Sequence, residues 1–161
     1  MKAVLDIPDL TKKLRAGGFP TASVIVHEGA NPNLYVQHQE AEGDPTAFIN
    51  AYTNPDWLEA VSNKPLSTLG IPEAMADGAD RHMVTVRRMD GTTRQPKNSG
   101  SEQLKITGHF PLTVSPSPAV LANGQVVIAF GPATMVGEWD FTISDASGNI
   151  APVAIHLGFA Q

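Results

Sequence analysis

The sequence predicts a mainly β fold: an antiparallel β-sandwich of Ig-like or jelly-roll-like Greek-key type, with a mixed N-terminal part that carries one or two short helices. Three observations predict it. Residues 106–137 contain no Lys, Arg, Asp or Glu, yet prolines and glycines divide them into short β-type runs, so they are not a membrane span. Residues 138–143 alternate between polar and apolar side chains, and residues 153–159 repeat the alternation. This period of two is typical of a hairpin with one face in a core.

Length and composition bound the organisation of the chain. Its 161 residues suit a mixed region, residues 1–80, followed by a sandwich, residues 81–161, or one continuous domain. No cysteine is present, which excludes disulfides, thiolate zinc sites and cysteine nucleophiles. The N-terminus lacks the apolar run of a signal peptide, so we expect synthesis in a cytoplasm.

The first element is a predicted helix over residues 6–16. Asp6 or Ile7 is suited to cap it, and a proline follows in the first turn. Leu10 and Leu14 share one face, and a Gly-Gly pair ends the helix.

Less regular elements follow. Residues 21–27 and 34–38 read as short strands joined by an Asn-Pro-Asn turn. Residues 46–52 fit either a helix or a strand. Residues 54–63 begin with Asn-Pro, which predicts a short helix, and residues 65–80 read as an irregular connection.

The remaining elements are predicted strands. They cover residues 83–89, 104–114 and 125–130, and the clearest is the hairpin formed by residues 138–159. Its alternation predicts four buried side chains: Trp139, Phe141, Ile155 and Leu157.

No catalytic, metal or nucleotide motif is present, so we expect no enzymatic activity, no metal, no cofactor and no small-molecule substrate. Three carboxylates alternate in the order Glu40, Glu42, Asp44, which fits a calcium site less well than a solvated turn. Residues 145–149 resemble part of a calcium loop but fit a hairpin turn better.

Two further groupings have a structural and a chemical interpretation. His27 and His38 could meet across a predicted hairpin, which would allow a metal site; ordinary strand-end histidines are the simpler interpretation. Glu138 and Asp140 lie about 7 Å apart by strand geometry, a spacing that suits a glycosidase pair. A wet strand face is the simpler interpretation of that pair.

Positive charge gathers in residues 81–105. The segment holds six Lys or Arg side chains against only Asp90 and Glu102, in a chain whose net charge is −5. This pattern predicts a contact with an acidic protein surface, with nucleic acid as the competing partner and a solvated loop as the alternative. The expected contact residues are Arg87, Arg88, Arg94 and Lys97.

The uncharged segment predicts a second contact, because obligate interfaces are depleted in charge. We expect residues 110–121, which hold three prolines, to lie on a partner as an extended arm. The contact side chains would be Phe110, Leu112, Val120 and Leu121.

Residues 104–161 resemble the Greek-key β-sandwiches of many virion proteins, through the runs ITGHFPLTV, GQVVIAFGP, GEWDFTISDASGN and APVAIHLGF. The absence of cysteine and the low charge also resemble tailed-phage structural proteins, above all capsid cement or decoration proteins. This resemblance implies a homo-oligomer bound to a major capsid or other virion protein, located in the virion or else in a cytoplasm, with no role for a membrane. The alternatives are a small β-sandwich binding module for carbohydrate or protein, and then a small hydrolase.

Overall fold

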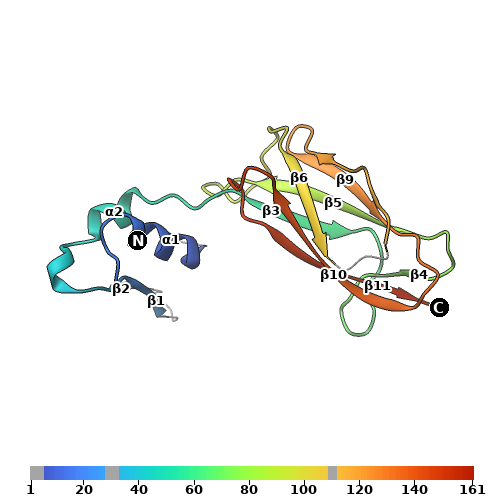
Figure 1. Cartoon of the computed structure of the whole chain (residues 1–161), viewed down its shortest axis with the longest axis horizontal. Helices are drawn as coiled ribbons and strands as arrows, with labels where there is room; N and C mark the ends of the chain where they lie inside the picture. Colours follow the sequence, from blue (N-terminus) through green and yellow to red (C-terminus); the bar gives the residue numbers. More distant parts are fainter. Residues whose placement is uncertain (1–5, 28–32, 109–111) are drawn as a thin grey trace. The chain divides into compact units, whose positions relative to one another are not determined.

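The computed structural model describes residues 6–27, 33–108 and 112–161, and the chain divides into two compact units (Figure 1). The first is Met1–Pro55 and the second is Asp56–Gln161. This division falls earlier than the predicted one at residue 80, because two strands that precede residue 80 belong to the sandwich. No helix of the described residues is long and apolar enough to cross a bilayer.

The first unit opens with the predicted helix, α1 (Ile7–Ala16). Asp6 caps it, since its side chain accepts a hydrogen bond from the Asp9 amide at 2.8 Å. Three further elements follow: a hairpin of β1 (Ser23–His27) and β2 (Asn33–Gln37), a short 3-10 turn η1 (Glu40–Glu42), and α2 (Thr46–Ala51). Of the ambiguous residues 46–52, all but Tyr52 therefore form a helix. A small core joins these elements: Leu10, Leu14, Phe19, Ala22 and Tyr52.

The second unit is a β-sandwich, which confirms the predicted fold class. One sheet has five strands in the order β4-β11-β10-β6-β8, and the other has four in the order β3-β5-β9-β7. All pairs are antiparallel except β4 with β11. The bounds are β3 Trp57–Ser62, β4 Glu73–Met75, β5 His82–Met89, β6 Gln103–Gly108, β7 Val114–Ser115, β8 Ala119–Val120, β9 Gln125–Phe130, β10 Gly137–Asp145 and β11 Val153–Ala160.

The core lies between the two sheets. Its centre is aromatic: Phe130 and Phe141 pack with ring centroids 4.8 Å apart. Two of the four side chains predicted to be buried, Phe141 and Leu157, are buried, whereas Trp139 and Ile155 are half-buried at the margin of the core. The alternation along β10 is therefore confirmed, and Trp139 and Ile155 are closer to solvent than expected.

The predicted helix over residues 54–63 is wrong, because residues 57–62 form strand β3. Leu58 is buried and Glu59 is exposed, which is the alternation of a strand, and β3 pairs along its whole length with β5. The amide of Leu58 also donates to the Ala151 carbonyl at 3.0 Å. Pairing on both sides of its first residues outweighs the local helix signal. The irregular connection predicted for residues 65–80 likewise contains a strand, β4.

The uncharged segment has a physical explanation within the sandwich. It passes from one sheet to the other and back, because β6 and β8 belong to the five-stranded sheet while β7 and β9 belong to the four-stranded one. Each crossing places side chains in the core, so charge is excluded. The predicted strand 104–114 ends at Gly108, where a Cβ would lie 2.4 Å from the Asp140 carbonyl oxygen.

The sandwich has two distinct ends. At the linker end, Trp57 lies beside Ala151 and opposite Met89, so the chain enters there. At the C-terminal end, Ala160 pairs with Met75. The turn after β9 also lies at this end, because His82 pairs with Phe130 there.

Candidate functional site: the Arg87 surface

Arg87 lies on the outer face of the four-stranded sheet, in β5, one of its two central strands. In the register of the sheet, Glu59 of β3 and Gln125 of β9 lie directly opposite it on either side. Its side chain is exposed, and no ion pair among the described residues involves it. A guanidinium held on a strand and outside every ion pair of the described residues is suited to bind a carboxylate from outside.

Two hollows meet at Arg87, and we call them together the Arg87 surface. The first, of about 280 Å³, lies over the sheet face and is lined by Glu59, Val61, Ser62, Asn63, Thr85 and Arg87. The second, of about 460 Å³, lies toward the linker end and is lined by Arg87, Gln95, Pro96, Lys97, Asn98, Asn123, Gly124 and Gln125. Arg87 lines both hollows. The second offers two cations and four amide side chains, and among the described residues no aromatic side chain lines either hollow.

Residues 90–97, which form one side of the second hollow, are a turn fixed by hydrogen bonds. Asp90 accepts hydrogen bonds from the amides of Thr92 and Thr93, each at 2.8 Å. Asp90 and Gln95 are joined through the backbone at 2.9 Å, as are Lys97 and Arg88. These hydrogen bonds fix the turn, which is continuous with the residues 95–98 that line the second hollow.

Gly124 allows this wall to approach the sheet. It lies with Asn123 in the turn before β9, and both residues have positive φ, 78° and 52°. A Cβ on Gly124 would lie 1.9 Å from the Lys97 carbonyl oxygen. Only glycine combines that backbone conformation with that approach.

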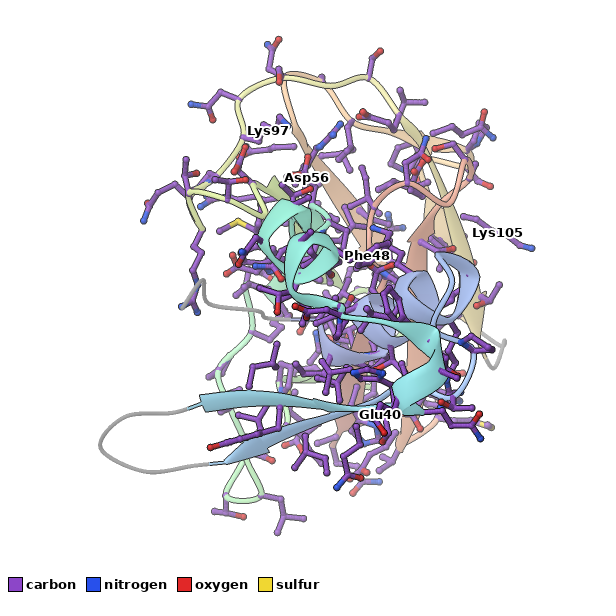
Figure 2. All side chains as sticks on the ribbon, turned by 90° about the vertical axis from the view of Figure 1, so that its left-hand side faces the viewer. Glu40, Phe48, Asp56, Lys97 and Lys105 are labelled. Carbon is purple, nitrogen blue, oxygen red and sulfur yellow. The ribbon has the colours of Figure 1, made fainter. Side chains whose placement is uncertain are left out.

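Arg88, the neighbour of Arg87, points to the other side of the strand and forms ion pairs within the sandwich. It donates to Asp56 through Nε at 2.7 Å and Nη2 at 2.6 Å, and it also pairs with Glu102. Lys97 Nζ lies 3.0 Å from the same Asp56 oxygen, and Figure 2 shows Asp56 and Lys97 together. Burial raises the pKa of Asp56, but hydrogen bonds from the Gly91 amide, Lys97 and Arg88 outweigh it and lower that pKa.

The four basic residues predicted as contacts differ in their exposure and in their ion pairs. Arg87 and Arg94 are exposed, and Arg94 lies in the turn with φ 62°. Arg88 is mostly enclosed in the ion network, so its predicted interface role does not fit the structure. Lys97 is shared between that network and the second hollow.

The predicted arm also separates. Leu112 and Leu121 are buried in the sandwich's own core, so they cannot lie on a partner while the sandwich is folded. Val120 is 44% exposed on the edge strand β8. Phe110 lies outside the described residues.

Three of the carboxylates weighed as calcium ligands have other partners. Glu42 accepts from the Thr21 hydroxyl at 2.6 Å, Asp44 accepts from the Thr46 hydroxyl at 2.6 Å, and Asp145 accepts from the Ser147 and Asn149 amides. Across the described residues, no group of three or more His, Asp or Glu side chains is placed to hold a metal ion. The side chain of His27 lies outside those residues, so the His27–His38 pair is not tested.

The Glu138 and Asp140 pair has a partner that sequence analysis missed. His156 of β11 lies opposite Asp140, and its Nε2 is 2.8 Å from Glu138 Oε2 while its Nδ1 contacts Asp140. The hydrogen bond to Asp140, followed by that to Glu138, raises the pKa of His156. The hairpin register would have revealed this contact. Because the imidazole engages both carboxylates, they do not present the open gap of a glycosidase pair.

Comparisons with known proteins support the fold. No protein-family model and no curated protein sequence matches the chain. A glycosyl hydrolase family 2 member from Bacteroides cellulosilyticus is similar in structure, with a TM-score of 0.51 and 10% identity over 84% of this chain and 16% of that one. The D0-D1 domain of Intimin is similar with a TM-score of 0.50 and 16% identity, over 86% of this chain and 62% of that one. At these identities the likeness shows a small β-sandwich domain and nothing about activity.

Proposed function

We propose that the chain is a protein-binding module whose sandwich holds a partner's carboxylate at Arg87. The observation that carries this proposal is the position of Arg87: it is exposed, makes no ion pair with another described residue, and lines two hollows on one sheet face. The surrounding amides are suited to the backbone of a peptide segment, because each offers both a donor and an acceptor.

The same surface is less suited to sugars. Carbohydrate recognition relies on aromatic side chains as stacking platforms, and in the part of the chain that the structure describes neither hollow is lined by one. Within the alternatives of a carbohydrate or a protein ligand, the lining therefore supports protein.

Glu59 allows a second test, in which a substitution should strengthen carboxylate binding. It lies opposite Arg87 in the register, so it repels an incoming carboxylate. Removing its charge should strengthen carboxylate binding, whereas removing the charge of Arg87 should weaken it. If the surface has no specific site, binding should change with neither substitution, or should weaken equally when any exposed Lys or Arg is neutralised.

The experiment measures the affinity of the whole chain for a short oligoglutamate peptide by calorimetry, with the matching oligoglutamine peptide as reference. We expect Arg87→Gln to weaken binding by about tenfold or more, the size of a lost charged hydrogen bond. Glu59→Gln should strengthen it. Lys105→Gln is the matched control, because Lys105 is exposed on β6 of the other sheet and lies apart from Lys97 in Figure 2. Equal weakening by Lys105→Gln would contradict the proposal, as would tighter binding of neutral oligosaccharides.

A structural role in a virion is a second proposal for this chain. The exposed apolar side chains at the C-terminal end of the sandwich support it: Leu66, Leu69, Met135 and Val136. It requires that purified chain binds the surface of the assembled particle. If substitution of Arg87 abolished binding to the particle, the particle would be the partner whose carboxylate Arg87 binds.

A further inference from the structure

The most exposed large apolar side chain in the described residues, Leu69, lies at the tip of a rigid hairpin. Residues 65–72 form this hairpin between β3 and β4. Leu66 pairs with Pro72, and the Ser67 amide donates to the Ile71 carbonyl at 2.7 Å. Glu73 and Pro65 close its base at 3.0 Å. Leu69 is 79% exposed, so a built turn presents it to solvent.

The base of the hairpin is fixed to the sandwich. The Gly158 amide of β11 donates to the Pro72 carbonyl at 2.9 Å. A Cβ on Gly158 would lie 3.4 Å from Ile71, so the hairpin packs against the β11 backbone. A fixed projection loses little conformational entropy when it binds, which favours its use as a contact.

The same end of the sandwich carries an apolar hollow of about 210 Å³. It is lined by Gly78, Leu112, Pro132, Ala133, Thr134, Met135 and Trp139. Trp139 is held in place there, because its ring lies edge-on to Phe159 with centroids 5.7 Å apart. Met135 is 61% exposed at the rim, so apolar surface continues outside the hollow.

Charge at this end does not oppose self-contact. Lys64 pairs with Asp80 at 2.6 Å, and Asp80 also accepts from the Met75 amide. Asp77 accepts from the amides of Ala79 and Asp80, and Arg81 is an exposed cation next to them. Opposite charges are thus interspersed around the apolar surface.

We propose that the hollow receives Leu69 of a second copy of this chain. A projecting apolar side chain and an apolar hollow at one end of the same unit allow a two-fold dimer, in which each copy gives Leu69 and receives its partner's. Exposed apolar surface of this kind marks contact sites in soluble proteins. This dimer uses the opposite end of the sandwich from the second hollow of the Arg87 surface, so it goes beyond the proposed function.

The test is sedimentation of the whole chain over a range of concentrations. The parent should form a dimer, and Leu69→Glu should weaken it by about tenfold or more because a charge would enter the hollow. Leu69→Glu should leave the fold intact, since the side chain is exposed. Val120→Glu is the matched control: it places the same charge at another exposed apolar position, on β8, and should leave the dimer unchanged.

Fluorescence gives a second readout of the same contact. The chain has two tryptophans, so Trp57→Phe leaves Trp139 as the reporter. Its emission should shift to shorter wavelength as the dimer forms, and Leu69→Glu should abolish the shift. A parent that is monomeric at every concentration would overturn the proposal. So would a dimer broken equally by Val120→Glu, or one that forms with no change at Trp139. Arg87→Gln should leave the dimer intact, which separates this proposal from the proposed function.

Discussion

Two histidines of the sandwich occupy opposite electrostatic environments. His82 is fully buried, with Nε2 2.8 Å from the Gly158 carbonyl and Nδ1 2.8 Å from Ser62 Oγ. Burial lowers its pKa, with Lys64 adding to the effect. His156 lies between two carboxylates, which raise its pKa. The same residue type is therefore neutral inside the core and favoured as a cation on the outer face.

We predict that the two rings titrate on opposite sides of pH 6.5, the ordinary histidine value. For His82, unfolding takes up a proton below pH 6.5, so its contribution to stability falls as the pH drops below that value. For His156, the stabilising contacts are present below pH 6.5 and are lost as the pH rises through its raised folded pKa. Ring-proton NMR titration measures both, with His156→Gln assigning one signal. If both rings titrated on the same side of pH 6.5, the contacts described for one of the two histidines would be contradicted.

At the scale of elements, predictability follows how local the determining contacts are. The last hairpin could be predicted because its alternation and its turn lie in one continuous stretch, and α1 because its cap and its glycine stop are local. Strand β3 could not, because its local Asn-Pro start favours a helix while its pairing with β5 and Ala151 comes from distant segments. The short strands β7 and β8 are defined only by their partners in the two sheets.

The candidate site follows the same rule. The sequence identifies a basic segment, but Arg87 and Arg88 are adjacent and chemically equal there. The structure separates them, because strand alternation turns Arg88 toward Asp56 and Glu102, far away in the sequence, and leaves Arg87 outside. Leu112 and Leu121 were predicted to contact a partner because their segment is uncharged. The segment is uncharged because it crosses between the two sheets and places these side chains in the core.

Burial along β10 predicts an order of mutational cost. Phe141 is fully buried against Phe130, so Phe141→Ala should lower the free energy of unfolding by about 3–5 kcal/mol. Trp139 is half-buried, so Trp139→Ala should cost roughly half as much, since the cost follows the apolar area removed from solvent. Urea denaturation of the whole chain at low concentration measures both. A larger cost for Trp139→Ala than for Phe141→Ala would contradict the register of this strand.

At the scale of the whole molecule, the chain combines a small mixed unit with a larger β-sandwich. The chain enters the sandwich at one end and leaves at the other, since β3 begins beside Ala151 and β11 ends beside Met75. The ion network anchors the first residue of the sandwich, Asp56, to Arg88 and Lys97. The Arg87 surface and the Leu69 hairpin are thus carried by one rigid unit.

The most direct measurement of the central claim is residue-by-residue NMR of the isotope-labelled chain during titration with oligoglutamate. Binding at the Arg87 surface predicts that the amide signals that shift gather in residues 59–63, 85–87, 95–98 and 123–125. The outer face of the other sheet, around Lys105 and Thr107, should remain unchanged. Shifts centred on Lys105, or spread over every exposed cation alike, would contradict the account, and so would no shift at the Arg87 amide.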